Sequence, residues 1–257
     1  MARKQTSKIA LVTGGNRGLG RNIAMSLARD GADVILTFNS NQTEGYTVVG
    51  EIRALGVRAE ALQLDITAMS TLDGFVDRIR TVLRDGFGGA ERIDFLVNNA
   101  GIGKAIPIDQ VTEADFEAFS NVHFKGVLFL TQKLLRMMKD NGAVVFITAA
   151  GDRYKVPGYG LYGSCKGAIE VFSRYVAVEY GPRGIRANTV APGGVMTDFA
   201  GGAIRANPKL QEMIVAQTPM GRLAEPKDIG ELVALICQDG SRWMTGQRLE
   251  ATGGYGL

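Results

Sequence analysis

Short β-rich runs alternate with amphipathic segments along the 257-residue chain, and this alternation constrains the fold more than any other feature. Several of the runs are almost entirely apolar, which is typical of strands in a parallel sheet that helices cover on both faces. The predicted strands are 8–13, 32–38, 57–65, 92–98, 142–148, 185–191 and 247–251. The predicted helices between them are 17–30, 43–55, 69–84, 113–140, 162–180 and 226–238. The pattern predicts an α/β fold with a doubly wound parallel sheet, formed by residues 1–257 as one domain.

The stretch 195–225 breaks this rhythm. It is long, it carries Gly201, Gly202, Pro208 and Pro219, and its apolar residues are scattered. Long excursions from a compact domain are often lids over a binding site. We therefore expect a lid after the sixth strand.

Composition and charge exclude several classes of protein. Hydrophobic residues make up 46% of the chain, and the net charge of +3 is too small and dispersed for a nucleic-acid binder. No apolar stretch approaches the roughly 18 residues of a membrane span, and the apolar run at 9–12 is too short for a secretory signal. Cys165 and Cys237 make no disulfide framework, and with His123 as the only histidine no metal site is expected. We expect a cytoplasmic protein that binds neither nucleic acid nor membrane.

The segment "LVTGGNRGLGRNIA" lies where the first predicted strand meets the first predicted helix. Its glycines have the spacing GxxxGxG, which lets the backbone turn tightly and approach a pyrophosphate. The N-terminus of the following helix offers free N–H groups and the positive end of its dipole. The turn therefore predicts a dinucleotide site, with the candidate cofactor-binding residues Gly14, Asn16, Arg17, Gly18, Leu19 and Gly20.

The residues after the next strands distinguish between the two nicotinamide cofactors. The second strand ends in "TFNSN", with no carboxylate to repel a 2′-phosphate, and Arg17 can supply a cation there. These features predict NADP rather than NAD. The third strand ends near the adenine position, and the short side chains of "NNAG" after the fourth strand would let the ribose pass. The candidates at these strand ends are Asn39, Ser40, Asp65, Ile66, Asn99, Ala100 and Gly101.

Tyr162 and Lys166 are four residues apart at the start of a predicted helix, so they share one face. A free tyrosine, with a pKa of about 10, is a poor acid–base catalyst near neutral pH. A nearby ammonium group favours the tyrosinate and lowers that pKa. Such a phenol can protonate a carbonyl oxygen as hydride arrives, or remove the proton in the reverse reaction.

Together the motifs resemble those of the short-chain dehydrogenase/reductase family. They are "TGGNRGLG", "LDIT", "NNAG", "NVHFKG", "YGSCK", "APGGVMT" and "TGQRLEATGG", and they span nearly the whole chain. The resemblance implies a Rossmann-like domain with a seven-stranded sheet, a nicotinamide cofactor, and a homotetramer or homodimer.

The resemblance also implies roles for particular residues. Tyr162 would be the acid–base group, and Lys166 would bind the nicotinamide ribose and lower the tyrosine pKa. Asn121 would hold a proton-relay water. The nicotinamide and its phosphates would contact Pro192, Gly193, Val195 and Thr197.

The serine that such a site usually carries is missing. Gapless matching places it at Ala149, which cannot donate a hydrogen bond, and the nearest hydroxyl belongs to Thr148. Neighbouring side chains on a strand point to opposite faces, so Thr148 reaches the site only through a local bulge. The sequence leaves three interpretations open. Thr148 substitutes for the serine, the site functions poorly or without a serine, or Asp152 or Tyr159 supplies the hydrogen bond.

Two functions follow from these features. The first is an NADP(H)-dependent oxidoreductase that interconverts a small-molecule ketone and a secondary alcohol, with Tyr162 as acid–base. The alternative is an NADP(H)-binding sensor or scaffold whose catalysis is impaired because Ala149 replaces the serine. His123 is expected to be packed in the core or in an interface, and fold alone does not identify the substrate.

Overall fold

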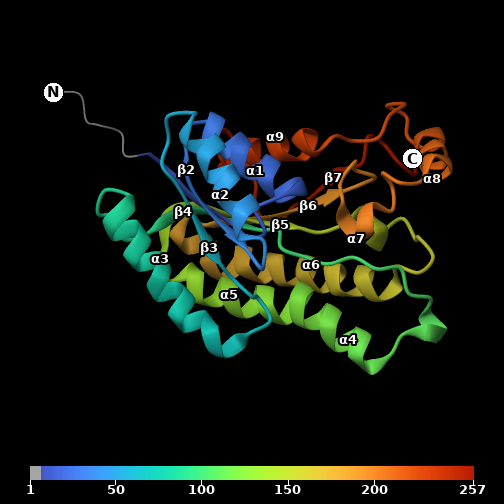
Figure 1. Cartoon of the computed structure of the whole chain (residues 1–257), viewed down its shortest axis with the longest axis horizontal. Helices are drawn as coiled ribbons and strands as arrows, with labels where there is room; N and C mark the ends of the chain where they lie inside the picture. The colour runs from blue at the N-terminus through green and yellow to red at the C-terminus, as the bar shows by residue number, and fades with distance from the viewer. Residues whose placement is uncertain (1–6) are drawn as a thin grey trace.

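The computed structural model describes residues 7–257 and contains a seven-stranded sheet in the order β3-β2-β1-β4-β5-β6-β7 (Figure 1). Every neighbouring pair of strands is parallel, so the predicted doubly wound sheet is confirmed. Each strand overlaps a predicted run. The strands are β1 (Ile9–Val12), β2 (Asp33–Phe38), β3 (Ala59–Gln63), β4 (Ile93–Asn98), β5 (Met138–Ile147), β6 (Arg186–Pro192) and β7 (Arg248–Ala251).

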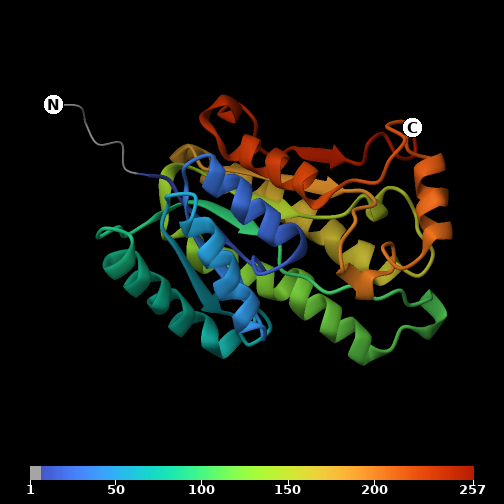
Figure 2. The ribbon, with the colours of Figure 1, turned by 45° about the horizontal axis from the view of Figure 1, so that its top comes forward.

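Helices cover both faces of the sheet (Figures 1 and 2). One layer contains α1 (Gly18–Arg29), α2 (Gln42–Arg53) and α9 (Pro226–Cys237). The other contains α3 (Leu72–Gly86), α4 (Glu113–Ser120), α5 (Gly126–Leu135) and α6 (Gly160–Tyr180). Strand side chains alternate between the two cores: Val34 and Leu36 of β2 pack with the first layer, and Ile35 packs with the second. This two-sided burial explains why the strands lack polar alternation.

The predicted helix 113–140 is helical only over 113–135, and it contains a π-helical turn that was not predicted. It is divided into α4, a π-helical turn at Asn121–Lys125, and α5, and the chain is already extended from Met138 onward. Met138 pairs with Ile93 of β4 before an irregularity in the register, and its side chain is fully buried. The polar residues 139–141 made this early part of β5 look like a helix end, because the strand pairing that fixes it is a long-range contact.

The sheet order places a crevice at the carboxyl ends of β1 and β4. From β1 the chain winds outward to β2 and β3, and then returns to build β4 to β7 on the other side. The loops after β1 and β4 therefore diverge at this point, which is where open α/β sheets bind ligands. Within residues 7–257, none of the helices combines the length and the apolar character needed to cross a membrane.

Candidate active site

A cavity of about 840 Å³ opens at the carboxyl edge of the sheet. Every predicted cofactor-binding residue lines it, as do Thr148 and Ala149. Asn121 is not among the lining residues, although its neighbour Val122 is. The described side chains form no cluster of three or more His, Cys, Asp or Glu residues suited to a metal ion. The structure thus brings together nearly all of the site residues that the sequence suggests, from the ends of six strands, β1 to β6.

The glycine turn between β1 and α1 requires glycine for steric reasons. Gly14 and Gly18 have φ values of +62° and +55°, in the left-handed region that favours glycine. A Cβ atom on Gly20 would lie 2.0 Å from the Gly14 carbonyl oxygen, which no side chain could tolerate. Helix α1 starts without a side-chain cap and has no acidic residue in its first turn. Its free N–H groups and positive dipole end are therefore available to an anion.

Asn99, after β4, holds this turn in place. Its Nδ2 donates to the carbonyl oxygens of Thr13 and Gly14, at 2.9 and 3.2 Å. In return, the Thr13 hydroxyl accepts hydrogen bonds from the backbone N–H groups of Asn99 and Ala100. The Asn99 side chain is therefore used to fix the loop that faces the cavity.

Glu44 is a cavity residue that the sequence reasoning missed. It lies in the first turn of α2, and its Oε2 accepts a hydrogen bond of 2.9 Å from Asn16 Nδ2. Arg17 and Ser40 line the same end of the cavity. The sequence argument considered only the residues directly after β2, and it found no carboxylate there. The signal that could have revealed Glu44 is its place in the opening turn of the next helix, whose N-terminus lies at the same sheet edge.

Tyr162 and Lys166 face the other end of the cavity from α6. Lys166 is buried, its Nζ donates 2.8 Å to the Ile147 carbonyl oxygen, and it lies 5.7 Å from the centre of the Tyr162 ring. Burial of the ammonium group lowers the pKa of Lys166 to about 8. The phenol thus stands beside a desolvated cation whose charge is only weakly screened by water.

Ala149 and Thr148 do not restore the missing serine. The β5–β6 register is regular up to Ile147 and Val190, and Ala149 is extended at φ −157° and ψ 145°. The Thr148 hydroxyl is directed to the neighbouring strand, with its Oγ1 3.3 Å from the Val190 carbonyl oxygen. The local bulge that would re-aim Thr148 is therefore not present. Tyr159 does line the cavity, with its ring 6.0 Å from that of Tyr162, whereas the Asp152 side chain lies outside the described part of the structure.

His123, rather than Asn121, is the residue of the π-helical turn that contacts Tyr162. Its ring lies edge-on to Tyr162 at 5.1 Å and is almost fully buried, as expected for a packed histidine. Nε2 lies 2.8 Å from the Ile102 carbonyl oxygen and 3.4 Å from the Ile102 backbone nitrogen. Burial, followed by the nearby charge of Lys166, lowers the pKa of His123 to about 3, and the ring is therefore neutral near pH 7. Single π-helical turns often occur at functional sites.

The segment 195–225 forms the outer wall of the cavity. It contains the short helices α7 (Phe199–Gly202) and α8 (Pro208–Ala216). Apolar side chains from this segment line the cavity, including Phe199, Ile204, Met213 and Ile214. Tyr154 and Tyr255, whose rings meet edge-on at 5.6 Å, also line it. The wall opposite the glycine turn is thus rich in apolar and aromatic surface.

Known proteins are similar to this chain over nearly their full length. A family model described as enoyl-(acyl carrier protein) reductase matches residues 14–256. A hydroxynaphthalene reductase-like protein of Metarhizium brunneum is 33% identical, over 98% of this chain and 96% of its own.

Two solved structures are also similar. The reductase LugOII, which catalyses keto-reduction at C1 during lugdunomycin biosynthesis, has a TM-score of 0.92 at 33% identity, over 98% of this chain and 99% of that one. The angucycline C-6 ketoreductase LanV with bound NADP has a TM-score of 0.91 at 30% identity, over 97% of this chain and 96% of that one. The chain belongs to the short-chain dehydrogenase/reductase family, a family of oxidoreductases.

Proposed function

We propose that this protein is an NADP(H)-dependent ketoreductase that interconverts a ketone and a secondary alcohol. The observation that carries the proposal is one cavity with the glycine turn at one end and the Tyr162–Lys166 pair at the other. The residues fit the cofactor: a Cβ on Gly20 would fill the turn, and the first turn of α1 is free of acidic side chains. Arg17 would hold the 2′-phosphate, and the LanV neighbour contains NADP.

The chain's own residues supply the proton and the binding surfaces. When bound, NADPH supplies a hydride to the carbonyl carbon. Tyr162 donates its phenolic proton to the carbonyl oxygen, and in the reverse direction it takes the proton back. The Lys166 ammonium stabilises the tyrosinate that remains and would bind the nicotinamide ribose. Ala149 contributes no donor, so Tyr162 carries more of the stabilisation of the developing charge on oxygen than it would beside a serine.

The cavity wall favours a planar aromatic ketone as substrate. Its aromatic lining residues are Tyr154, Tyr159, Tyr162, Phe199 and Tyr255. Aromatic rings prefer offset or edge-on contacts with one another, so such a wall binds fused rings well. The relative from Metarhizium brunneum is named for a hydroxynaphthalene, a fused aromatic system. We therefore propose fused-ring aromatic ketones as the substrate class.

A panel of ketones tests the function and the substrate class. Purified protein is mixed with NADPH and with an aliphatic, a single-ring or a fused-ring ketone, and the loss of NADPH absorbance is followed. We expect the fused-ring ketone to be reduced with the highest kcat/KM. The specific observation behind the alternative function is Ala149. Tight NADPH binding with no turnover, in the wild type and in Ala149→Ser alike, would support a cofactor-binding sensor or scaffold instead.

The pH dependence of the reaction should follow Lys166. A lysine is charged below its pKa, so the cation beside Tyr162 is present below about pH 8 and lost above it. Because kcat/KM reports the free enzyme, we expect kcat/KM for ketone reduction to fall as the pH rises through this value. In Lys166→Arg the side chain keeps its charge above that pH, so the fall in kcat/KM should occur at a higher pH. A profile that stays flat well above the Lys166 pKa would contradict this role.

Glu44 should weaken the binding of the 2′-phosphate. Its carboxylate lies at the cavity end lined by Arg17 and Ser40, where it repels a second anion. We expect Glu44→Gln to bind NADPH roughly 5-fold more tightly and NADH with little change, as measured by fluorescence titration. The gain should shrink at high salt. The matched control is Glu51→Gln, which removes the same charge from α2 at a residue paired with Arg21 outside the cavity. An equal gain in the control would contradict a local effect of Glu44.

We also propose that a second copy of the chain covers the outer face of α5 and α6. These helices lie side by side in both views (Figures 1 and 2). Each of them exposes large apolar side chains. Val178 and Tyr175 of α6 are 75% and 63% exposed, and Phe129 of α5 is 40% exposed. Large apolar side chains exposed on neighbouring helices are typical of an interface, and a self-complementary dimer is the commonest kind of assembly. A molar mass of one chain by light scattering at micromolar concentration would contradict the proposal.

A further inference from the structure

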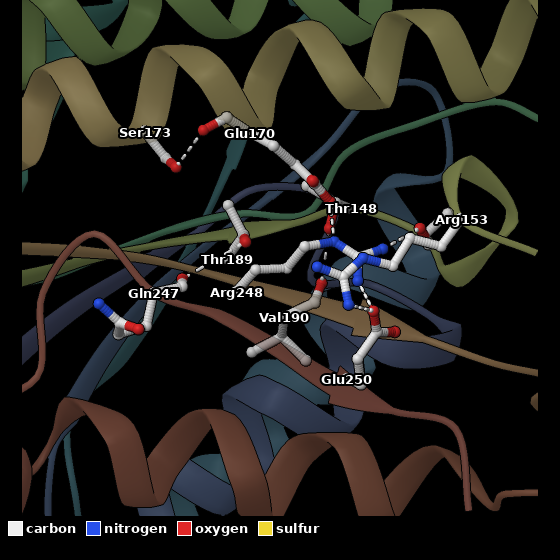
Figure 3. A network of polar contacts seen from close by, with 10 residues as sticks. Thr148, Arg153, Glu170, Ser173, Thr189, Val190, Gln247, Arg248 and Glu250 are labelled. Atoms are coloured by element: carbon white, nitrogen blue, oxygen red, sulfur yellow. Dashed lines mark hydrogen bonds and ion pairs between the residues drawn. The ribbon is translucent and has the colours of Figure 1, made fainter. Parts of the chain in front are cut away.

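Four charged side chains form a group near the end of β5, in which Arg153 is exposed and the other three are largely covered (Figure 3). They are Arg153, Glu170, Arg248 and Glu250, which we call the charge quartet. Arg248 is its centre: Nε donates 2.5 Å to Glu170 Oε1, and the guanidinium forms an ion pair with Glu250. Arg153 pairs with the same Glu250 carboxylate at 3.3 Å. The side chains of Arg248 and Glu170 are only 10% and 12% exposed, and the four charges balance.

Arg248 also binds the backbone at the position of the missing serine. Its Nη2 donates 3.2 Å to the Ala149 carbonyl oxygen. Two residues earlier on β5, the Ile147 carbonyl oxygen accepts from Lys166 Nζ at 2.8 Å. The end of β5 is therefore held by two cations, one from α6 and one from β7. Both contacts act on backbone that lines the cavity.

The quartet connects this strand end to the helix that carries the proton donor. Tyr162, Lys166 and Glu170 follow one another at intervals of four residues, so they lie along one face of α6. Glu170 Oε1 accepts a hydrogen bond from Arg248, and the Ala149 carbonyl oxygen accepts another from the same guanidinium. Arg153 extends the same group to the loop that leads to Tyr154 in the cavity wall. A displacement of Arg248 would therefore change the spacing between Ala149 and Tyr162.

Stability alone is a poor explanation for a buried ion pair. Removing charges from water costs several kcal/mol per ion, and apolar replacements of both partners are often neutral or stabilising. Reaction rates, in contrast, respond strongly to small displacements, since a shift of about 1 Å can cost about 100-fold. The rate should be especially sensitive here, because Tyr162 must align the substrate without the second hydrogen-bond donor that a serine at position 149 would supply.

We propose that Arg248 is a positioning residue that sets the distance between Tyr162 on α6 and the end of β5 at Ala149. It acts through the Glu170 carboxylate and the Ala149 carbonyl, and it touches neither substrate nor cofactor. This inference rests on the proposed ketoreductase function for its effect on rate. Its structural part, the coupling of α6 to the strand end, is independent of turnover.

The double variant Arg248→Met/Glu170→Met tests the proposal. It removes one charge of each sign and leaves the Arg153–Glu250 pair intact, so no buried charge loses its counter-charge. We expect kcat for ketone reduction to fall about 10-fold or more. The Kd for NADPH should change by less than about two-fold, because the glycine turn lies across the sheet on β1. Amide hydrogen exchange across residues 149–163 should become faster in the free protein.

Two further variants separate positioning from loss of stability. Arg58→Met breaks the pair with Asp33, a buried carboxylate at the start of β2, which lies on the other side of β1 from β7. It should lower the Tm while leaving kcat and the exchange of 149–163 unchanged. Arg248→Lys keeps the charge and should retain more of kcat than the double variant.

The outcomes distinguish this inference from the proposed function. Wild-type kcat and wild-type exchange in the double variant would overturn the positioning role of Arg248. A wild-type protein that reduces no ketone would contradict the proposed function, and faster exchange at 149–163 in the double variant would then still support the coupling. Unchanged amide exchange at 149–163 in the double variant would overturn the coupling of α6 to the end of β5. A fall in kcat for Arg58→Met as large as that for the double variant would show a general loss of stability, and would also overturn the proposal.

Discussion

Tyr162→Phe should lower kcat for ketone reduction by about 10²- to 10⁴-fold, because it removes the hydroxyl that protonates the carbonyl oxygen. The phenyl ring keeps its contacts with His123 and Phe199, at 5.1 and 5.7 Å between ring centres, so the cavity wall should stay in place. Binding of NADPH should therefore change by less than about two-fold. Stopped-flow measurement of a single turnover, with NADPH binding by fluorescence, checks both expectations.

The control for this substitution is Tyr46→Phe. Tyr46 lies on α2, is 47% exposed, and is absent from the cavity lining. It should leave kcat unchanged, as expected for an exposed residue distant from the reaction. A Tyr162→Phe protein with wild-type kcat would show that another group supplies the proton, and the assignment of Tyr162 would be lost.

Ala149→Ser should raise kcat by about 10-fold or more. Removing one such donor from an enzyme costs roughly 10²- to 10³-fold, and this sets the upper bound for restoring it here. The substitution is small, Ala149 already lines the cavity, and its extended backbone suits a serine. The gain should appear in kcat more than in KM, because the new hydrogen bond strengthens as charge develops on the oxygen. Steady-state kinetics with a fused-ring ketone measures it.

Ala149→Cys separates the hydrogen bond from the size of the side chain. A thiol is close to a hydroxyl in shape but is a weak donor, so this variant should show little of the gain. If the serine variant is no faster than wild type, the wild-type site already holds an adequate donor. Tyr159, on the same cavity, would then be the residue to examine, since Thr148 is directed toward Val190.

Features that arise from local pattern were predicted well from the sequence. Apolar runs predicted the strands, and the glycine spacing predicted a tight turn, in which the structure then shows Gly20 close to the Gly14 carbonyl. Tyr162 and Lys166 share a helix face, so their spacing alone placed them together. The parallel sheet then brings the strand ends to one edge, which explains why residues far apart in sequence line one cavity.

Features that depend on side-chain contacts between distant elements were not predicted. Arg248 lies 78 residues from Glu170 and 99 from Ala149 in sequence, and nothing in "TGQRLEATGG" indicates either partner. Glu44 was overlooked because its carboxylate reaches the cavity from a helix. Asn121 was assigned by motif resemblance, and the contact between His123 and Tyr162 was not foreseen. The start of β5 at Met138 was not predicted, because it is fixed by a long-range pairing with Ile93 of β4.

The bonds that Asn99 makes to Thr13 and Gly14 have a consequence for cofactor capture. They order the phosphate-facing loop when the polypeptide folds, before any nucleotide arrives. The binding site is therefore preorganised, and the chain loses little conformational entropy when the cofactor binds. A substitution of Asn99 should accordingly lower the stability of the cofactor-free protein and also weaken its binding of the cofactor.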